Sequence, residues 1–391
     1  MAFDVFRARA ETPGCDEVLH FNNAGAGLLP APVLAAVKDH LDAEALAGGY
    51  EAAAAAHDRV ERTYAAAAAL LNCAPGEIAL VENATRAWDM AFYAFRFAAG
   101  DRILTAEAEY ASNYIAYLQV AHATGASVEA IPSDAQGQVS AEALAAMIDD
   151  RVKLIAITHV PTNGGLVNPA AAVGRIARDA GIPFLLDACQ SVGQMPVDVA
   201  AIGCDILSAT GRKYLRGPRG TGLLYVRRAL IETLEPPFLD LHAAEWTAAD
   251  TYIIRDDARR FETWEGSVAG KIGLGVALDY ALGWGLPAIY ERISALAARL
   301  RDGLAAIPGI TLRDLGAERC GIVTFTGDGS SPAEIQRALA AQKINIAVSP
   351  RNFTRLDMDA RDLDALARAS VHYYNTEDEV ERFCAAVAKI A

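Results

Sequence analysis

A lysine and a carboxylate, each close behind a buried apolar strand, are the residues of this sequence best placed to do chemistry. Asp187 follows the apolar run Phe184–Leu186, and Lys213 comes five positions after the run Ile206–Ser208 and just before the glycine-rich turn Arg216–Gly222. Ligands of parallel sheets collect at the carboxyl ends of strands. A lysine with a lowered pKa is a covalent nucleophile. Taken alone, each residue also has an ordinary explanation: a helix N-cap for Asp187 and a solvated loop for Lys213.

A third segment offers a site for an anion. Glu82–Trp88 joins the apolar run Ile78–Val81 to a helix that we expect to reach about Phe97. Free N–H groups at a helix start, together with the Thr85 hydroxyl, would cradle a phosphate, although a plain Asn/Thr cap also explains the segment. An amine, an acid beside a pyridine nitrogen and a phosphate site are what pyridoxal 5′-phosphate (PLP) requires. The three segments together therefore favour a PLP site centred on Lys213.

The elements that must position these residues alternate along the first two thirds of the chain. Short apolar runs alternate with alanine-rich helical patterns, which predicts an α/β fold with a mostly parallel sheet covered by helices. From about Gly285 the pattern becomes that of a smaller α+β domain. We expect residues 1–20 to pack with the small domain, 21–284 to form the large domain and 285–391 to form the small one. The expected strands are Ile78–Val81, Arg102–Thr105, Ser127–Ile131, Leu154–Thr158, Phe184–Leu186, Ile206–Ser208 and Gly220–Arg227.

Composition excludes several classes of protein. The 391 residues carry 49 acidic and 35 basic side chains, a formal net charge of −14, which argues against a nucleic acid partner. We expect no signal peptide and no membrane span, since neither a basic start with an apolar run nor 18 consecutive apolar residues is present; this points to the cytoplasm. The six cysteines and seven histidines have no ligand spacing, so we expect reduced cysteines and no metal site.

These segments resemble the class V aminotransferase family of fold-type I PLP enzymes, which includes cysteine desulfurases, cysteine C–S lyases and isopenicillin N epimerase-like proteins. The specific part is Asp187-x-x-Gln190, followed by Lys213 and Arg216–Gly220, and His20–Gly27 and Ala367–Thr376 extend the similarity over nearly the whole chain. The resemblance implies a large PLP domain, a smaller C-terminal α+β domain and a homodimer with active sites at its interface.

The resemblance also implies a role for each matching residue. Lys213 would be the Schiff-base lysine and the general base, Asp187 would pair with the pyridine nitrogen, and Gln190 would bond the phenolate oxygen of PLP. Arg368 would clamp the α-carboxylate of a small amino-acid substrate, a bidentate task that suits guanidinium. The remaining expected contacts are Thr85, Arg86, Ser208 and Arg212 to the cofactor and Asn23 to the substrate.

The sequence departs from the desulfurase pattern at several places. Tyr110 stands where desulfurases stack a histidine on the cofactor, and tyrosine keeps the flat face but has a much higher ordinary pKa. Arg212 replaces the histidine before the lysine. Thr162 or Asn163 would take over the cofactor contact of a serine–asparagine pair. In the segment Arg260–Ser267, which resembles the loop that reaches the partner's phosphate, Glu265 occupies the expected hydroxyl position, and Ser267 is the nearest replacement.

One absence bears on the reaction. Desulfurases take up sulfur on a cysteine of a mobile loop, but the matching segment Val348–Thr354 has no cysteine and carries Arg351 instead. Arg351 would bind an anionic substrate or be a solvated loop arginine. We therefore expect a β-eliminating lyase that cleaves a C–S bond; the alternatives are an α-amino acid aminotransferase, an epimerase and, in a different class, a non-catalytic binding protein with this fold.

Overall fold

The computed structural model describes residues 3–390, so residues 1, 2 and 391, at the outer ends of the expected N-terminal segment and small domain, lie outside the described residues. Its largest sheet has the strand order β2-β8-β7-β6-β5-β3-β4, in which β7 to β4 are parallel and β8 is antiparallel to both neighbours. The expected α/β fold with a mostly parallel sheet is confirmed. The strands are β2 (Ile78–Val81), β3 (Arg102–Ala106), β4 (Ser127–Ile131), β5 (Val152–Thr158), β6 (Phe184–Asp187), β7 (Ile206–Thr210) and β8 (Gly222–Val226).

Helices cover both faces of this sheet because its strands are apolar on both sides. Successive side chains of a strand point to opposite faces, so Leu185 packs in one core with α5 and α6, whereas Leu186 packs in the other with α4 and α8. Two further helices, α2 and α11, pack against one another, and α11 also packs on α4. The helices of this domain are α2 (Ala31–Ala47), α3 (Gly49–Ala55), α4 (His57–Leu71), α5 (Ala84–Phe92), α6 (Ala111–Thr124), α7 (Ala141–Met147), α8 (Ala170–Asp179), α9 (Val199–Ile202), α10 (Arg228–Ile231) and α11 (Val268–Trp284).

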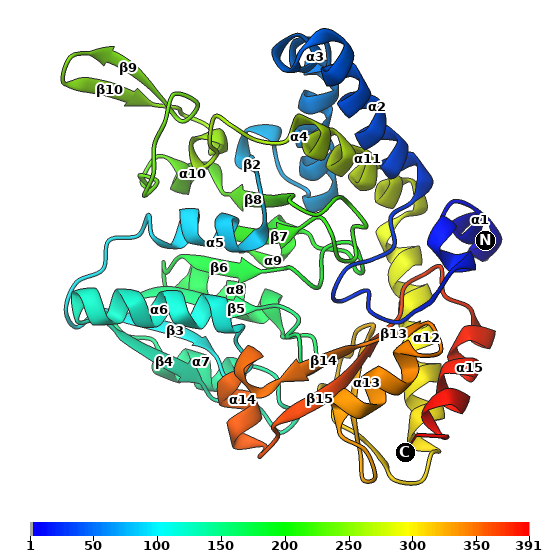
Figure 1. Ribbon diagram of the computed structural model, residues 1–391. Coiled ribbons are helices and arrows are strands. Elements are labelled where there is room, and N and C mark those ends of the chain that lie inside the picture. The colour runs from blue at the N-terminus through cyan, green and yellow to red at the C-terminus, as the bar shows by residue number, and fades with distance from the viewer. Residues whose placement is uncertain (1–2, 391) are drawn as a thin grey trace.

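A second sheet, with the order β11-β12-β15-β14, forms the smaller unit at the lower right of Figure 1. The N-terminal segment lies against it: β1 (Leu19–His20) pairs in parallel with β13 (Ile344–Asn345), and Arg9 of α1 (Val5–Ala10) forms an ion pair of 2.7 Å with Glu379. The other elements are β11 (Ile310–Leu312), β12 (Ile322–Gly327), β14 (Ala347–Pro350), β15 (Ala365–Ser370), α12 (Leu286–Ala305), α13 (Pro332–Ala340), α14 (Arg355–Ala360) and α15 (Glu377–Val387).

A two-stranded hairpin, which the sequence analysis did not anticipate, projects from the large unit at the upper left of Figure 1. It consists of β9 (Ala244–Ala248) and β10 (Thr251–Ile254). Residues 3–390 also contain four short 3₁₀ helices: η1 (Pro13–Asp16), η2 (Pro75–Glu77), η3 (Ala258–Phe261) and η4 (Arg351–Phe353).

The helix that follows β2 is shorter than expected. It ends at Phe92, and Phe95 and Phe97 pack against the same core from irregular backbone instead. The sequence pattern predicted a longer helix because these apolar residues continue the helical spacing, although their backbone is not helical.

Within residues 3–390, no single helix is long and apolar enough to cross a bilayer, and only the pair α11 and α12, bent by 79°, passes that test jointly. Over the same residues, no group of three or more His, Cys, Asp or Glu side chains could hold a metal ion.

Candidate active site

A cavity of about 450 Å³ lies at the carboxyl ends of β5, β6 and β7. The start of α5 and the start of α6 close it from the side. Parallel strands deliver their last residues to one edge of the sheet, which is why segments far apart in sequence meet here. Its lining residues are Asn83, Ala84, Thr85, Tyr110, Thr158, Val160, Thr162, Asp187, Cys189, Gln190, Thr210, Arg212 and Lys213.

Lys213 reaches this cavity from the turn after β7. Lys213 is partly buried, and this burial lowers the pKa of its ammonium group below the ordinary lysine value; the nearby charges of Arg212 and Arg368 lower it further, whereas Asp187 acts in the opposite direction. A lysine whose charged form is disfavoured carries the free amine needed to attack a carbonyl carbon or remove a proton.

Asp187 is the last residue of β6 and is buried beside Lys213 in the lining. One carboxylate oxygen accepts a hydrogen bond from the Cys189 backbone N–H (2.9 Å), and the other accepts one from the Asn113 side chain (2.9 Å). These two donors hold the carboxylate in one orientation.

The loop between β2 and α5 has the geometry of an anion site. The side chain of Asn83 caps the N–H of Arg86 (2.9 Å), which leaves the N–H groups of Ala84 and Thr85 at the first turn for a ligand. Gly222 of β8 lies against this loop, where a Cβ atom would come within 2.7 Å of the Asn83 carbonyl carbon. The side chain of Arg86 lies outside the lining, with its guanidinium 5.0 Å from the ring of Phe238.

The strand before Lys213 contributes Thr210, not Ser208, to the cavity. Ser208 is buried, and its hydroxyl has no hydrogen-bond partner among the described residues. Alternation along β7 places both residues on one face, and Thr210 stands nearer the carboxyl end. The sequence analysis missed Thr210, although its position three residues before Lys213 was a usable signal.

Gln190 and Tyr110 both line the cavity, one from the turn after β6 and one from the start of α6. Gln190 donates one N–H to the Ala24 carbonyl (3.1 Å), which leaves its second N–H for a ligand. The Tyr110 ring meets Phe353 of η4 edge to face, with ring centroids 6.4 Å apart.

Arg368 comes from β15 of the smaller unit and is buried. Its guanidinium donates to the Thr162 hydroxyl and has no carboxylate partner among residues 3–390, and its Nε has no hydrogen-bond partner there either. Burial lowers the pKa of Arg368 to about 10. A buried guanidinium without a counter-charge is suited to bind an anionic group of a ligand.

Besides Arg86 and Ser208, three more of the expected contact residues lie outside the lining. Asn23 uses its amide on the Ser370 carbonyl (2.7 Å) and accepts from the Tyr374 hydroxyl (2.5 Å). Arg351 pairs with Asp364 (2.8 Å) and Asp359 (3.1 Å) on the smaller unit. Neither lines the cavity that contains Lys213.

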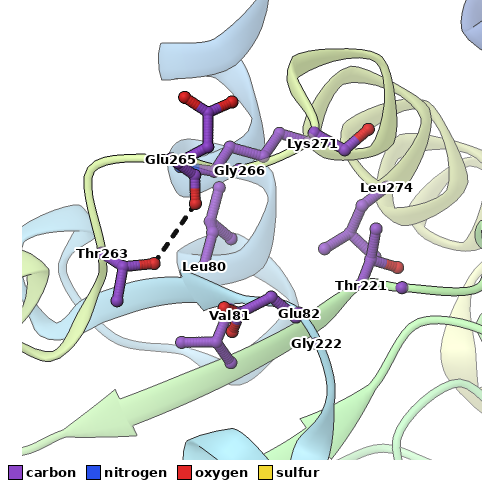
Figure 2. Close-up of a pocket in the computed structure, with 12 residues that line it drawn as sticks. Leu80, Val81, Glu82, Thr221, Gly222, Thr263, Glu265, Gly266, Lys271 and Leu274 are labelled. Carbon is purple, nitrogen blue, oxygen red and sulfur yellow. Dashed lines mark hydrogen bonds between the residues drawn. The ribbon is translucent and has the colours of Figure 1, made fainter.

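Ser267, the third, caps the first turn of α11 by accepting from the Gly270 N–H (3.0 Å). It lines a separate small cavity with Glu82 and Glu265, shown in Figure 2, where the Thr263 hydroxyl donates to the Glu265 carbonyl (3.3 Å). Within one chain, therefore, this loop does not reach the lining around Lys213.

Cys189 is a further residue of the cavity that the sequence analysis did not assign to the site. Its position two residues after Asp187 suggests a packed side chain, but it is half-buried and lines the cavity. It lies at the turn after β6, where backbone leaves the sheet and successive side chains no longer alternate between faces. Burial raises the pKa of its thiol well above the ordinary value, so it is protonated at neutral pH.

The residues in and around the cavity fit PLP. Gln190 and Ser208 each keep a buried polar oxygen without a partner in the described part of the chain, and Arg368 keeps its Nε, whereas unsatisfied buried polar atoms are rare in proteins. The lining also supplies an amine, an oriented carboxylate and two free N–H groups at a helix start. Lys213, Asp187 and the Ala84–Thr85 backbone would hold the aldehyde carbon, pyridine nitrogen and phosphate respectively.

Comparison with known proteins agrees with this chemistry. The family model described as aminotransferase class-V matches residues 19–383. A probable cysteine desulfurase of Xylella fastidiosa is 31% identical over 380 residues, which cover 95% of this chain and 91% of the relative. A probable cysteine desulfurase of Methanothermobacter thermautotrophicus is 27% identical over 390 residues, covering 98% of this chain and 97% of the relative.

Solved structures share the fold. The apo cysteine desulfurase from Thermococcus onnurineus superposes with a TM-score of 0.92 at 26% identity, covering 100% of this chain and 98% of that one. A cystine C–S lyase, C-DES, in complex with its product cysteine persulfide superposes with a TM-score of 0.87 at 24% identity, covering 97% of this chain and 99% of that one. At the latter identity the similarity concerns the fold alone.

Proposed function

The chain belongs to the class-V aminotransferase family, and from that membership we propose that it is a β-eliminating lyase that cleaves the C–S bond of a cysteine-derived amino acid. It is a PLP-dependent enzyme of the cysteine desulfurase-like type. The fate of the substrate, and the absence of a persulfide step, are the parts that we propose.

One observation carries the choice of elimination over sulfur transfer. The segment that faces Tyr110 from the smaller unit, Pro350–Thr354, has no cysteine and presents the ring of Phe353. Persulfide transfer needs a thiolate that can approach the substrate sulfur. Burial raises the pKa of each of the six thiols, so none is poised as a thiolate: Cys15, Cys73, Cys189, Cys204, Cys320 and Cys384.

The proposed roles follow from position. Arg368 binds the substrate α-carboxylate, and Lys213 Nζ takes the Cα proton. PLP, when bound, withdraws electrons from Cα through its protonated pyridine ring. Asp187 would keep that ring nitrogen protonated, Tyr110 would stack on the ring, and Gln190 would donate to the phenolate oxygen.

Further proposed contacts complete the site. The Thr85 hydroxyl and the N–H groups of Ala84 and Thr85 hold the phosphate, with Thr210 nearby. Thr162 orients Arg368, and Arg212 adds a permanent positive charge. The Ser208 hydroxyl is buried on the same strand as Thr210, and the Arg86 backbone N–H is capped by Asn83 at the start of the same helix. The Cβ–S bond breaks, the sulfur leaves with the bonding pair and a proton, and hydrolysis with one water yields pyruvate and ammonia.

A mixture assay tests the proposal. Purified holoenzyme is incubated with S-substituted cysteines and with ordinary amino acids, and pyruvate, ammonia and pyridoxamine phosphate are measured. Stoichiometric pyruvate and ammonia from the S-substituted cysteines support the lyase. Pyridoxamine phosphate with a keto acid indicates an aminotransferase, and loss of optical activity alone indicates an epimerase; either result contradicts the proposal.

We also propose a homodimer in which the β9–β10 hairpin contacts the second copy. Isolated monomers rarely expose a contiguous apolar patch of this kind. Ser267 and Glu265 then face the partner's cofactor phosphate rather than their own. Six large apolar side chains on or beside the hairpin are at least half exposed: Phe238, Leu241, Trp246, Tyr252, Ile253 and Trp264.

Light scattering tests this assembly. The wild type is expected at twice the chain mass of 41.4 kDa, and the double variant Trp246→Asp, Ile253→Asp at a lower mean mass. A monomeric wild type at micromolar concentration contradicts the dimer. A matched control is Leu46→Asp, an exposed residue at the end of α2, away from the hairpin.

The division into a large domain (21–284) and a small domain (285–391), with residues 1–20 on the small one, is also part of the proposal. The bend between α11 and α12 at Gly285 (φ 83°) and the pairing of β1 with β13 support it. If it holds, Glu379→Gln, which removes the charged partner of Arg9, increases hydrogen exchange in α1 and leaves the exchange of β5 to β7 unchanged.

A further inference from the structure

A second carboxylate lies directly behind Asp187. Glu109 is 2% exposed and Asn113 is 3% exposed. Asn113 uses its amide to join the two acids, because its Nδ2 donates to Glu109 Oε1 (2.9 Å) and to Asp187 Oδ2 (2.9 Å). The proposed reaction assigns no task to this buried glutamate.

Glu109 is also the point where three elements meet. Its carboxylate accepts from the Thr105 hydroxyl of β3 (2.9 Å), from the Thr158 N–H (3.1 Å) and hydroxyl (2.5 Å) at the end of β5, and from the Tyr110 N–H (2.8 Å) at the start of α6. Such a set of donors, two of them backbone N–H groups, favours the ionised form. Burial acts the other way and raises the pKa of Glu109 to about 7.

We propose that Glu109 is a positioning residue of the PLP site: through Asn113 it holds the carboxylate that meets the pyridine nitrogen, and through the Tyr110 backbone it holds the ring that stacks on the cofactor. The inference rests on the proposed roles of Asp187 and Tyr110. Through these two contacts, the Glu109 side chain fixes both the carboxylate beside the pyridine nitrogen and the aromatic ring that stacks on the cofactor.

A structural brace would explain the same hydrogen bonds, but it makes a different prediction. If Glu109 only ties β3, β5 and α6 together, its loss lowers stability without changing the state of the bound cofactor. If it positions Asp187, removal of the Asn113 hydrogen bonds alone changes the protonation of the pyridine nitrogen. The hydrogen bonds from Thr105 and Thr158 to Glu109 remain in that variant.

The test uses the purified protein loaded with PLP that carries ¹⁵N at the pyridine nitrogen, and reads the ¹⁵N chemical shift and the PLP dissociation constant. The variants are Glu109→Gln, which keeps the shape, and Asn113→Leu, which keeps the volume and removes both donated bonds. Glu107→Gln, two residues away on the same loop and bonded to Ser133 (2.5 Å), is the matched control. Asp187→Asn is the reference for a nitrogen that has lost its counter-charge.

Both Glu109→Gln and Asn113→Leu are expected to shift the ¹⁵N signal toward that of Asp187→Asn and to weaken PLP binding by about tenfold, the effect of one hydrogen bond to a charged group. Glu107→Gln is expected to leave both readouts unchanged. Wild-type shift and affinity in Asn113→Leu would overturn the inference, whatever the stability of Glu109→Gln. An unchanged shift in Asp187→Asn would instead overturn the assignment of Asp187, and the inference with it.

Discussion

The guanidinium of Arg368 donates a hydrogen bond to the hydroxyl of Thr162, a residue 206 positions earlier in the chain. This contact joins the smaller unit to the edge of the cavity and leaves the rest of the guanidinium, including Nε, without a partner among the described residues. The arginine is thereby oriented while most of its donors remain available.

Arg368→Ala is expected to lower kcat/KM by about 10- to 100-fold, the loss of roughly 1.5–3 kcal/mol for hydrogen bonds to a charged group. Most of the loss is expected in KM, since the α-carboxylate is bound equally before and during reaction. Thr162→Val, which only frees the guanidinium, should cost less. If Arg368→Ala keeps full activity in steady-state kinetics, Arg368 does not bind the substrate carboxylate.

Lys213→Ala is expected to abolish turnover, because both the covalent attachment of PLP and the base at Cα are lost. The purified wild type is expected to be yellow, and borohydride reduction followed by peptide mapping should find the cofactor on Lys213. Lys153→Ala, an exposed lysine of β5, serves as the control. Finding the cofactor on any other lysine contradicts the whole site assignment.

Asp187→Asn keeps the shape and removes the negative charge beside the pyridine nitrogen. We expect turnover to fall as far as in Lys213→Ala, with the cofactor still bound, because a neutral ring no longer withdraws electrons from Cα. Absorbance reports cofactor content, and single-turnover kinetics report the rate. Near-normal activity of Asp187→Asn would show that Asp187 only caps the turn after β6 and does not act on the pyridine nitrogen.

Cys189→Ala is expected to leave turnover largely intact, although Cys189 lines the cavity. A protonated thiol does not attack sulfur, and burial raises the pKa of this one. Mass spectrometry after incubation with cysteine should find no added sulfur on any cysteine. A sulfur adduct on Cys189 accompanied by alanine production would show that the protein is a desulfurase.

Lys213→Met is expected to raise the Tm of the cofactor-free protein near neutral pH. Because burial lowers the pKa of Lys213 in the folded state, the unfolded chain binds this proton more tightly, and the charged lysine destabilises the fold at low and neutral pH. The cost disappears as pH rises through the ordinary lysine pKa of about 10.4. Thermal unfolding of the two proteins between pH 7 and about 10.5 measures the difference, and a gap that widens with pH would contradict the burial of this amine.

Local sequence was sufficient to predict the fold class and to select two residues, Asp187 and Lys213, that line one cavity. Runs of three to eight residues identified all seven strands of the large sheet to within about two residues, and polar residues after two of them, Asp187 and Lys213, were predicted to belong to one site. That inference needs only strand periodicity and the rule that parallel strands end on one side. The family itself was also recognisable from these segments, and the comparisons confirm it.

Contacts between distant segments were decided by the tertiary structure alone. Asn23 and Arg351 carry suitable groups, yet the first is used on Ser370 and Tyr374 and the second on aspartates of its own unit. Which donor a side chain meets depends on how β1, β14 and β15 pack, and no local pattern encodes that packing. For the same reason the sequence showed neither Thr162 beneath Arg368 nor the buried link from Asp187 through Asn113 to Glu109.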